Sequence, residues 1–193
     1  MSVWIAKVVI VVGIVALAVV RVPHMKRAGA VKVVADQRGV LDNLVVAFVS
    51  IGTFVPLLWV ATTVLGVAEY PLGRVPFLAG VLFLSGGLWL LHRTHVELGT
   101  NWSNTLELRE THELIAHGAY RHVRHPVYGA LLLHGLGQAL IVPNWVAGPL
   151  FFVAFAVLVA LRLGPEERMM RARFGEAYEA YWHRTTRLVP RLW

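Results

Sequence analysis

Residues 127–161 read VYGALLLHGLGQALIV, then PN, then WVAGPLFFVAFAVLVAL. Both apolar stretches are hydrophobic enough to be membrane-embedded helices, and only Pro143 and Asn144 separate them. Because so short a connection makes neighbouring helices antiparallel, the sequence predicts a helical hairpin. His134 and Gln138 lie inside its first, shorter arm, which is typical of a helix that faces protein or a polar cavity.

Three more apolar stretches precede this hairpin. Hydrophobic residues make up 57% of the chain and charged residues 15%, whereas a soluble domain has about 25% charged residues. This composition excludes a disordered chain, and the lack of cysteine excludes disulfide scaffolds and thiolate chemistry. The expected fold is an all-α integral membrane protein with about five transmembrane helices, a C-terminal helical hairpin and a cytoplasmic amphipathic helix. The predicted membrane segments are Val3–Val20, Leu44–Ala68, Val75–Leu91, Val127–Val142 and Trp145–Leu161.

The positive charges predict how the chain is oriented. The net charge is +7, and all lysines and arginines except Lys7 and Arg74 lie in residues 21–41, 92–126 and 162–193. Five spans place these three stretches on one side, which the positive-inside rule makes cytoplasmic. We expect a multi-pass protein with its N-terminus outside and its C-terminus in the cytoplasm, with a bacterial inner membrane favoured. Topology explains the basic residues, so no nucleic-acid partner is predicted.

The stretch HELIAHGAYRHVRHPVY, residues 112–128, leads directly into the fourth predicted helix. Pro126 fits the first helical position, and the free N–H groups there, together with Arg124, predict an anion-binding mouth. Several of the nine histidines lie in this polar region and raise the possibility of a metal site. The chain has no H-E-x-x-H pattern, so no metal is predicted.

A second polar group follows the fifth predicted helix. Adjacent carboxylates near the edge of a bilayer are costly unless they are paired. The hairpin returns this end of the fifth helix to the start of the fourth, which predicts one cytoplasmic pocket. The residues expected to converge there are Arg124, His125, Arg162 and Glu166.

The tail after residue 162 predicts an amphipathic helix on the membrane surface. Met170, Phe174, Tyr178 and Tyr181 recur at steps of three or four, with charged residues between them. Upstream, Gly164-Pro165 predicts an interruption of the helix, because proline removes a backbone hydrogen bond.

These motifs together resemble the isoprenylcysteine carboxyl methyltransferase family and the related phospholipid methyltransferases. The matching elements are HELI (112–115), GAYRHVRHPVYG (118–129), the short hairpin, R…EE (162–167) and FGEAYEAY (174–181). The resemblance extends from about Asn101 to the C-terminus. The apolar stretches predict three N-terminal transmembrane helices in residues 1–91, and the resemblance implies a catalytic methyltransferase region in residues 92–193, in one structural unit.

The resemblance also implies a membrane methyltransferase that uses S-adenosylmethionine, with Arg162 and Glu166 as catalytic residues. Arg162 would bind the acceptor's carboxylate, and Glu166 would take the cofactor's amino group. The other implied cofactor-binding residues are His112, Glu113, Leu114 and Ile115 at the adenosine, Tyr120, and His125, Pro126, Val127 and Tyr128 at the methionine part.

The implied reaction is carboxyl O-methylation of an isoprenylated cysteine or a similar hydrophobic carboxylate. Phospholipid or small-lipid N-methylation, a sterol-type NADPH reductase and a non-enzymatic lipid-binding protein remain alternatives. The partners expected are membrane lipids and a lipophilic acceptor that arrives through the bilayer, and the oligomeric state is open. Small residues on the third and fourth helices predict either a gap that admits the acceptor or close helix packing. These residues are Ser85, Gly86, Gly87, Gly129, Gly135 and Gly137.

Overall fold

The computed structural model of the chain describes residues 2–30, 33–36, 39–101, 107–109 and 113–190. The architecture of these ranges is helical, apart from one two-stranded antiparallel ribbon. Its elements are α1 Val3–Gly29, β1 Val33–Asp36, α2 Val40–Ala61, α3 Arg74–Leu98, β2 Glu107–Arg109, α4 Pro126–Ile141, α5 Leu150–Phe174 and α6 Glu176–Arg184, with 3-10 turns at Gly66–Ala68, Gly99–Asn101 and Gly118–Arg121.

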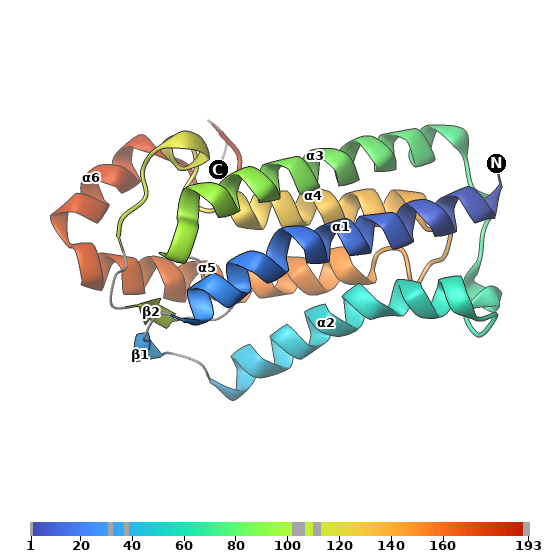
Figure 1. Cartoon of the computed structure of the whole chain (residues 1–193), viewed down its shortest axis with the longest axis horizontal. Helices are drawn as coiled ribbons and strands as arrows, with labels where there is room; N and C mark the ends of the chain where they lie inside the picture. Colours follow the sequence, from blue (N-terminus) through green and yellow to red (C-terminus); the bar gives the residue numbers. More distant parts are fainter. Residues whose placement is uncertain (1, 31–32, 37–38, 102–106, 110–112, 191–193) are drawn as a thin grey trace.

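The long helices α1 to α5 run side by side along the molecule, and α2 lies at one edge of the bundle (Figure 1). Among the described residues, α1, α2 and α3 are long and apolar enough to cross a membrane. The apolar helix α4 has 16 residues, and α5 combines an apolar first half with a charged second half. This is the fold of an integral membrane protein, and the count of five spans stays a prediction.

The helices α3 and α4 pack closely through glycines on their facing surfaces. A Cβ atom on Gly87 would lie 2.7 Å from the backbone nitrogen of His134, and one on Gly137 would lie 2.5 Å from that of Leu84. Only a residue without a side chain allows the two backbones to approach this closely. The predicted gap between these helices is therefore wrong, and the alternative of close packing is confirmed.

Helix α5 begins later than the predicted membrane segment Trp145–Leu161. The Asn144 side chain accepts hydrogen bonds from the backbone N–H groups of Val146 and Ala147, at 3.0 and 2.9 Å. These bonds stabilise a turn over the residues that the sequence assigns to the helix. The helix therefore begins at Leu150.

The second half of α5 also corrects the sequence-based prediction. The helix continues through Pro165 to Phe174, although a break at Gly164-Pro165 is predicted. Glu167 and Met169, which follow the proline, are 3% and 7% exposed, so their packing offsets the one backbone hydrogen bond that proline removes.

The tail contains two helices where the sequence predicts one. Gly175 has φ +52°, a backbone conformation that favours glycine, and it separates α5 from α6.

Candidate functional site

A cavity of about 460 Å³ lies at the end of the bundle that carries the C-terminal ends of α1, α3 and α5 and the N-terminal ends of α2 and α4. We call this end the basic end. Arg124, His125, Arg162 and Glu166 all line the cavity, as their order along the hairpin predicts. Its volume lies within the range of about 300–1,000 Å³ that is usual for small-molecule sites.

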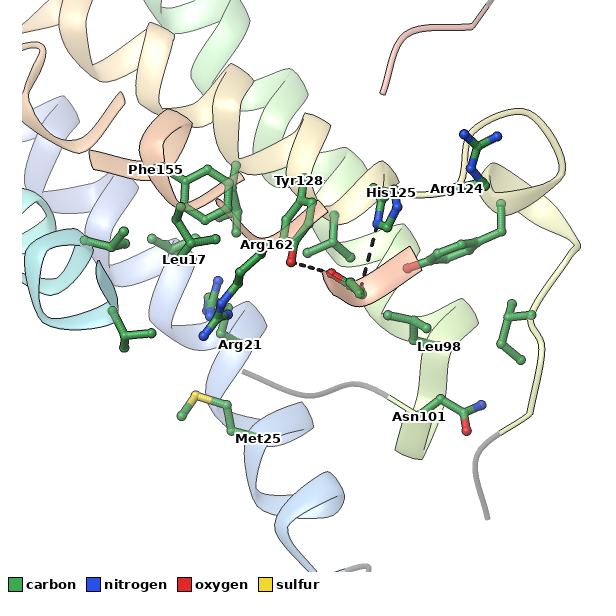
Figure 2. Close-up of a pocket in the computed structure, with 18 of the residues that line it drawn as sticks. Leu17, Arg21, Met25, Leu98, Asn101, Arg124, His125, Tyr128, Phe155 and Arg162 are labelled. Carbon is green, nitrogen blue, oxygen red and sulfur yellow. Dashed lines mark hydrogen bonds and ion pairs between the residues drawn. The ribbon is translucent and has the colours of Figure 1, made fainter. Parts of the chain in front are cut away.

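The cavity has a polar arm and an apolar arm. Figure 2 shows Leu17 and Phe155 on one side of Arg162, and Tyr128 and His125 on the other. The apolar arm is lined from three helices, by Ile14, Leu17, Ala18, Val22 and Met25 of α1, by Val46, Val49, Ser50, Thr53 and Phe54 of α2, and by Phe151, Phe155 and Leu158 of α5. The hydroxyls of Ser50 and Thr53 donate to carbonyl oxygens of their own helix. The polar arm is lined by Asn101, Glu113, Tyr120, Arg124, His125, Tyr128 and Glu166.

Most of the predicted site residues line this cavity. Pro126 instead is buried at the first position of α4, as predicted for the start of that helix. His112 lies outside the described residues. The predicted residues that line the cavity are Glu113, Leu114, Ile115, Tyr120, His125, Val127, Tyr128, Arg162 and Glu166.

The Glu166 carboxylate is held by two aromatic side chains from the start of α4. The Tyr128 hydroxyl donates a hydrogen bond to Glu166 Oε2 at 2.6 Å, and His125 Nδ1 lies 3.9 Å from Glu166 Oε1 (Figure 2). The rings of His125 and Tyr128 stack, with centroids 5.5 Å apart and planes 10° from parallel. Glu166 is therefore a fixed negative charge in the cavity wall, suited to a ligand's ammonium group.

The neighbouring carboxylate, Glu167, joins three segments of the chain. Arg124 Nε and Arg187 Nη2 each lie 3.0 Å from a Glu167 oxygen, and His125 Nε2 lies 3.4 Å from Oε1. Burial alone would raise the pKa of Glu167, but the nearby His125 ring and the hydrogen bond and charge of Arg124 outweigh it and lower the pKa to about 2.

Arg124 has a structural role that the sequence does not indicate. Besides Glu167, its guanidinium donates to the carbonyl oxygens of Trp182 and Thr185, and it stacks on the Trp182 ring at 3.9 Å. The backbone N–H of Arg124 donates to Thr186 O at 2.8 Å. These contacts fix α6 against the segment that precedes α4. Arg124 is consequently committed to this network, and its predicted part in an anion-binding mouth is not supported.

We expect the variant Glu167→Gln to flatten the pH dependence of thermal stability. The pKa of Glu167 is lower in the folded chain than the ordinary value of 4.5. Its contribution to folding is therefore complete above pH 4.5 and is lost as the pH falls towards 2. The contribution amounts to about 3 kcal/mol at neutral pH. Thermal unfolding of detergent-solubilised protein between pH 6 and 3 measures it, and equal slopes for wild type and variant would contradict the assignment.

Tyr120 presents a buried polar atom to the cavity. Its side chain is 6% exposed, and its hydroxyl has no hydrogen-bond partner among the described residues. Burial raises the pKa of this phenol, so the group stays protonated and can donate a hydrogen bond. A buried hydroxyl without a partner in the protein is suited to a bound ligand.

The backbone around Tyr120 is fixed by contacts from α3 and α6. The Tyr181 hydroxyl donates to the Tyr120 carbonyl oxygen at 2.7 Å, and Glu97 Oε2 accepts from the backbone N–H of Ala119 at 2.8 Å. Gly118 has φ +58°, and a side chain there would collide with the Glu97 carboxylate. The cavity wall at Tyr120 is thus built from elements that are distant in sequence.

The first two helices place two charged residues at the site whose part in it is not predicted from the sequence. Arg21 of α1 lines the cavity, and Asp42 of α2 pairs with Arg162 through both carboxylate oxygens. One signal is visible in the sequence, since Asp42 is a single carboxylate beside a long apolar segment and such a charge is costly unless paired. Its partner cannot be read from the sequence, because the two residues are 120 positions apart.

Comparison with known proteins connects this site to one family. Residues 79–172 match the model of the isoprenylcysteine carboxyl methyltransferase (ICMT) family. The chain is 28% identical over 110 residues to protein-S-isoprenylcysteine O-methyltransferase of Schizosaccharomyces pombe, which covers 56% of this chain and 47% of the relative. It is 31% identical over 101 residues to protein-S-isoprenylcysteine O-methyltransferase B of Arabidopsis thaliana, which covers 49% of each chain. The chain thus spans about half the length of the curated relatives it matches.

The fold agrees with this relationship. The structure of the eukaryotic intramembrane Ras methyltransferase ICMT superposes with a TM-score of 0.51 at 21% identity, and the match covers 80% of this chain and 54% of the other. The family match contains α4, most of α5 and therefore Tyr128, Arg162 and Glu166. Through residues 79–172, the chain is similar to the isoprenylcysteine carboxyl methyltransferase family in sequence, and it shares the fold of the ICMT structure.

Proposed function

We propose that the chain is an S-adenosylmethionine-dependent methyltransferase that methylates the carboxylate of an isoprenylated cysteine or a similar hydrophobic acid. The observation that carries this proposal is the main cavity, in which Arg162 lies between a polar arm and an apolar arm. Such a cavity suits two ligands that meet at Arg162, a soluble one in the polar arm and a lipid-like one in the apolar arm. The names of the related proteins support the same acceptor class.

The polar arm fits the cofactor. S-adenosylmethionine, when bound, supplies a methyl group on a positively charged sulfur. Glu166, fixed by Tyr128, would pair with the ammonium of its methionine part. The buried Tyr120 hydroxyl would donate to a polar atom of the same ligand. The segment Glu113–Ile115 would line the adenosine, because all three of its residues line the same cavity as Tyr120.

The apolar arm fits a hydrocarbon chain. The lining residues of α1, Ile14 to Met25, recur at steps of three and four and therefore form one face of that helix. The lining residues of α2, Val46 to Phe54, form a similar face. Ile14 and Met25 are eleven positions apart, about 16 Å along the helix, which is long enough for an extended isoprenoid chain. The acceptor would reach this cleft from the bilayer.

The reaction needs positioning more than acid–base chemistry. A carboxylic acid has a pKa near 4 and is ionised at neutral pH, so the chain need not provide a general base. Arg162 would hold and orient the acceptor's carboxylate for transfer of the methyl group that the cofactor would supply. The buried aromatic and aliphatic residues of the cavity would exclude water from the reacting atoms.

In the proposed orientation, the basic end of this integral membrane protein faces the cytoplasm. The arginines and lysines beside the cavity support this orientation through the positive-inside rule. A soluble cofactor would then enter from the cytoplasm.

The direct test is methyl transfer by the purified chain from radiolabelled S-adenosylmethionine. We expect an S-farnesyl-N-acetylcysteine acid to become a base-labile methyl ester, and its carboxamide to remain unlabelled. Label in phosphatidylethanolamine instead would show N-methylation and overturn the carboxylate assignment. If the acid, its carboxamide and phosphatidylethanolamine all stay unlabelled, and the chain does not bind S-adenosylhomocysteine, a methyltransferase activity is excluded.

We expect Tyr120→Phe to weaken binding of S-adenosylhomocysteine by about tenfold, because one hydrogen bond to the ligand is worth about 1–1.5 kcal/mol. Calorimetry on detergent-solubilised protein measures this effect. A matched control is Tyr70→Phe, which removes a hydroxyl that donates to Val142 O at 3.3 Å. Tyr70 does not line the cavity, so the control should bind normally. Equal affinities in both variants would remove Tyr120 from the cofactor site.

A further inference from the structure

Asp42 and Arg162 form a two-point ion pair between α2 and α5. Arg162 Nε lies 2.5 Å from Asp42 Oδ1, and Arg162 Nη2 lies 2.7 Å from Asp42 Oδ2. Each side chain is 8% exposed. A guanidinium grips any carboxylate in this parallel geometry, whether it belongs to the protein or to a ligand.

The pair lies where two cavities share a residue. Arg162 lines the main cavity and also a smaller one of about 210 Å³ between α2 and α5. The smaller cavity lies beside the first turns of α2. Val40, Leu41 and Leu44 in these turns are 78%, 60% and 62% exposed. Val45, in the second turn, is 8% exposed and lies in one core cluster with Leu158 and Leu163 of α5, so the ion pair and Val45 together hold this end of α2 against α5.

The middle of α2 is held to α5 in a different way. A Cβ atom on Gly52 would lie 2.8 Å from the Phe151 Cα, so the two helix backbones touch there. Asp42 is ten residues before Gly52, a distance of about 15 Å along the helix. Release of Asp42 would thus let the first turns of α2 move about a fixed point at Gly52.

We propose that the Asp42 carboxylate occupies Arg162 when no acceptor is bound, and that the acceptor's carboxylate displaces Asp42 from Arg162 on binding. We call the ion pair between Asp42 of α2 and Arg162 of α5 the latch. The acceptor's identity rests on the proposed function, whereas the latch does not. Displacement frees the first turns of α2, which directly precede the α2 residues that line the apolar arm, Val46 to Phe54. Asp42 is then a specificity-determining residue rather than a catalytic one.

The exchange discriminates between substrate and product. A carboxylate can replace Asp42 because it has the same charge and the same two acceptor oxygens. A methyl ester is neutral and competes poorly, so Asp42 regains Arg162 after methyl transfer and promotes release of the product. An amine acceptor would be repelled by the guanidinium and could not open the latch.

The first test measures binding of S-farnesyl-N-acetylcysteine acid and its methyl ester, each with S-adenosylhomocysteine present. Because Asp42→Asn removes the competing charge, we expect the acid to bind about tenfold tighter to this variant than to wild type, and the ester to change by less than about twofold. Unchanged or weaker binding of the acid to Asp42→Asn would overturn the proposal, since a residue that merely supports Arg162 gives that result.

The matched control is Glu179→Gln. Glu179 forms an ion pair of 2.9 Å with Arg171 and so links α5 to α6, but both side chains are more than 40% exposed and neither lines the cavity. Acid and ester should bind this variant as they bind wild type. Tighter binding of the acid to Glu179→Gln as well would show a general electrostatic effect and would overturn the specific role of Asp42.

The second test needs no acceptor. The chain has no cysteine, so Leu41→Cys and Leu161→Cys can carry two spin labels across the smaller cavity without further changes. We expect Asp42→Asn to lengthen and broaden the distance between the labels, and the acid to do the same in the labelled protein that keeps Asp42. Distances unaffected by Asp42→Asn would overturn the latch. If the latch opens but the acid binds neither protein, the acceptor assignment and the proposed function fail while the latch stands.

Discussion

Replacement of Arg162 by lysine is expected to lower kcat/KM for a hydrophobic carboxylic acid by about 100-fold. Lysine keeps the positive charge, and with it the topology signal, but it lacks the planar fork that binds two carboxylate oxygens at once. The 100-fold decrease in kcat/KM has two causes. One charge-assisted hydrogen bond is lost, and the acceptor's carboxylate is no longer held in a fixed orientation. Radiolabelled methyl transfer measures the rate, and calorimetry with S-adenosylhomocysteine should show normal cofactor affinity.

The matched control is Arg168→Lys. Arg168 lies on the same helix and is exposed, so its replacement tests the charge of α5 without touching the cavity. Its activity should stay near that of wild type. Near-normal methyl transfer by Arg162→Lys would assign Arg162 to anchoring at the membrane surface and would favour an acceptor without a carboxylate.

The second large effect concerns folding. We expect Gly87→Val to lower the free energy of unfolding by at least about 3 kcal/mol, because a side chain there would meet the backbone of α4 at His134. Helix α3 would have to move away from α4, and the cavity wall formed by the start of α4 would move with it. Loss of the monodisperse peak in detergent and a lower unfolding temperature measure the effect.

The adjacent residue provides the control. A Cβ atom on Gly86 would meet nothing within 4 Å, so Gly86→Val should lower the unfolding temperature only slightly. Similar stability of both variants would show that α3 and α4 can separate, and would restore the gap between them as an entrance for the acceptor.

The sequence predicts the hairpin and the polar end of the site because both depend on local signals. Pro143-Asn144 limits the connection to a turn, and Pro126 marks the first residue of α4. These two features suffice to bring the start of α4 beside the charged half of α5. The convergence of His125 and Glu166 on one cavity follows from them.

The sequence does not predict features that depend on distant packing. The pairing of Asp42 with Arg162 requires α2 to lie against α5, and apolar periodicity does not specify which helices are neighbours. The continuation of α5 through Pro165 likewise depends on buried contacts beyond it, at Glu167 and Met169. Local propensity predicts a break there, and tertiary packing overrides it.

The continuity of α5 has a consequence for the range of acceptors. Arg162 and Glu166 are one helical turn apart on the same face, about 6 Å along the axis. In the proposed roles, one rigid rod carries the anchor for the cofactor and the anchor for the acceptor's carboxylate. A tilt of α5 moves both anchors together and preserves their spacing. The spacing on α5 therefore selects the acceptor's head group and not its hydrocarbon tail. We expect the methyl-transfer step to have similar rates for acceptors with tails of different lengths.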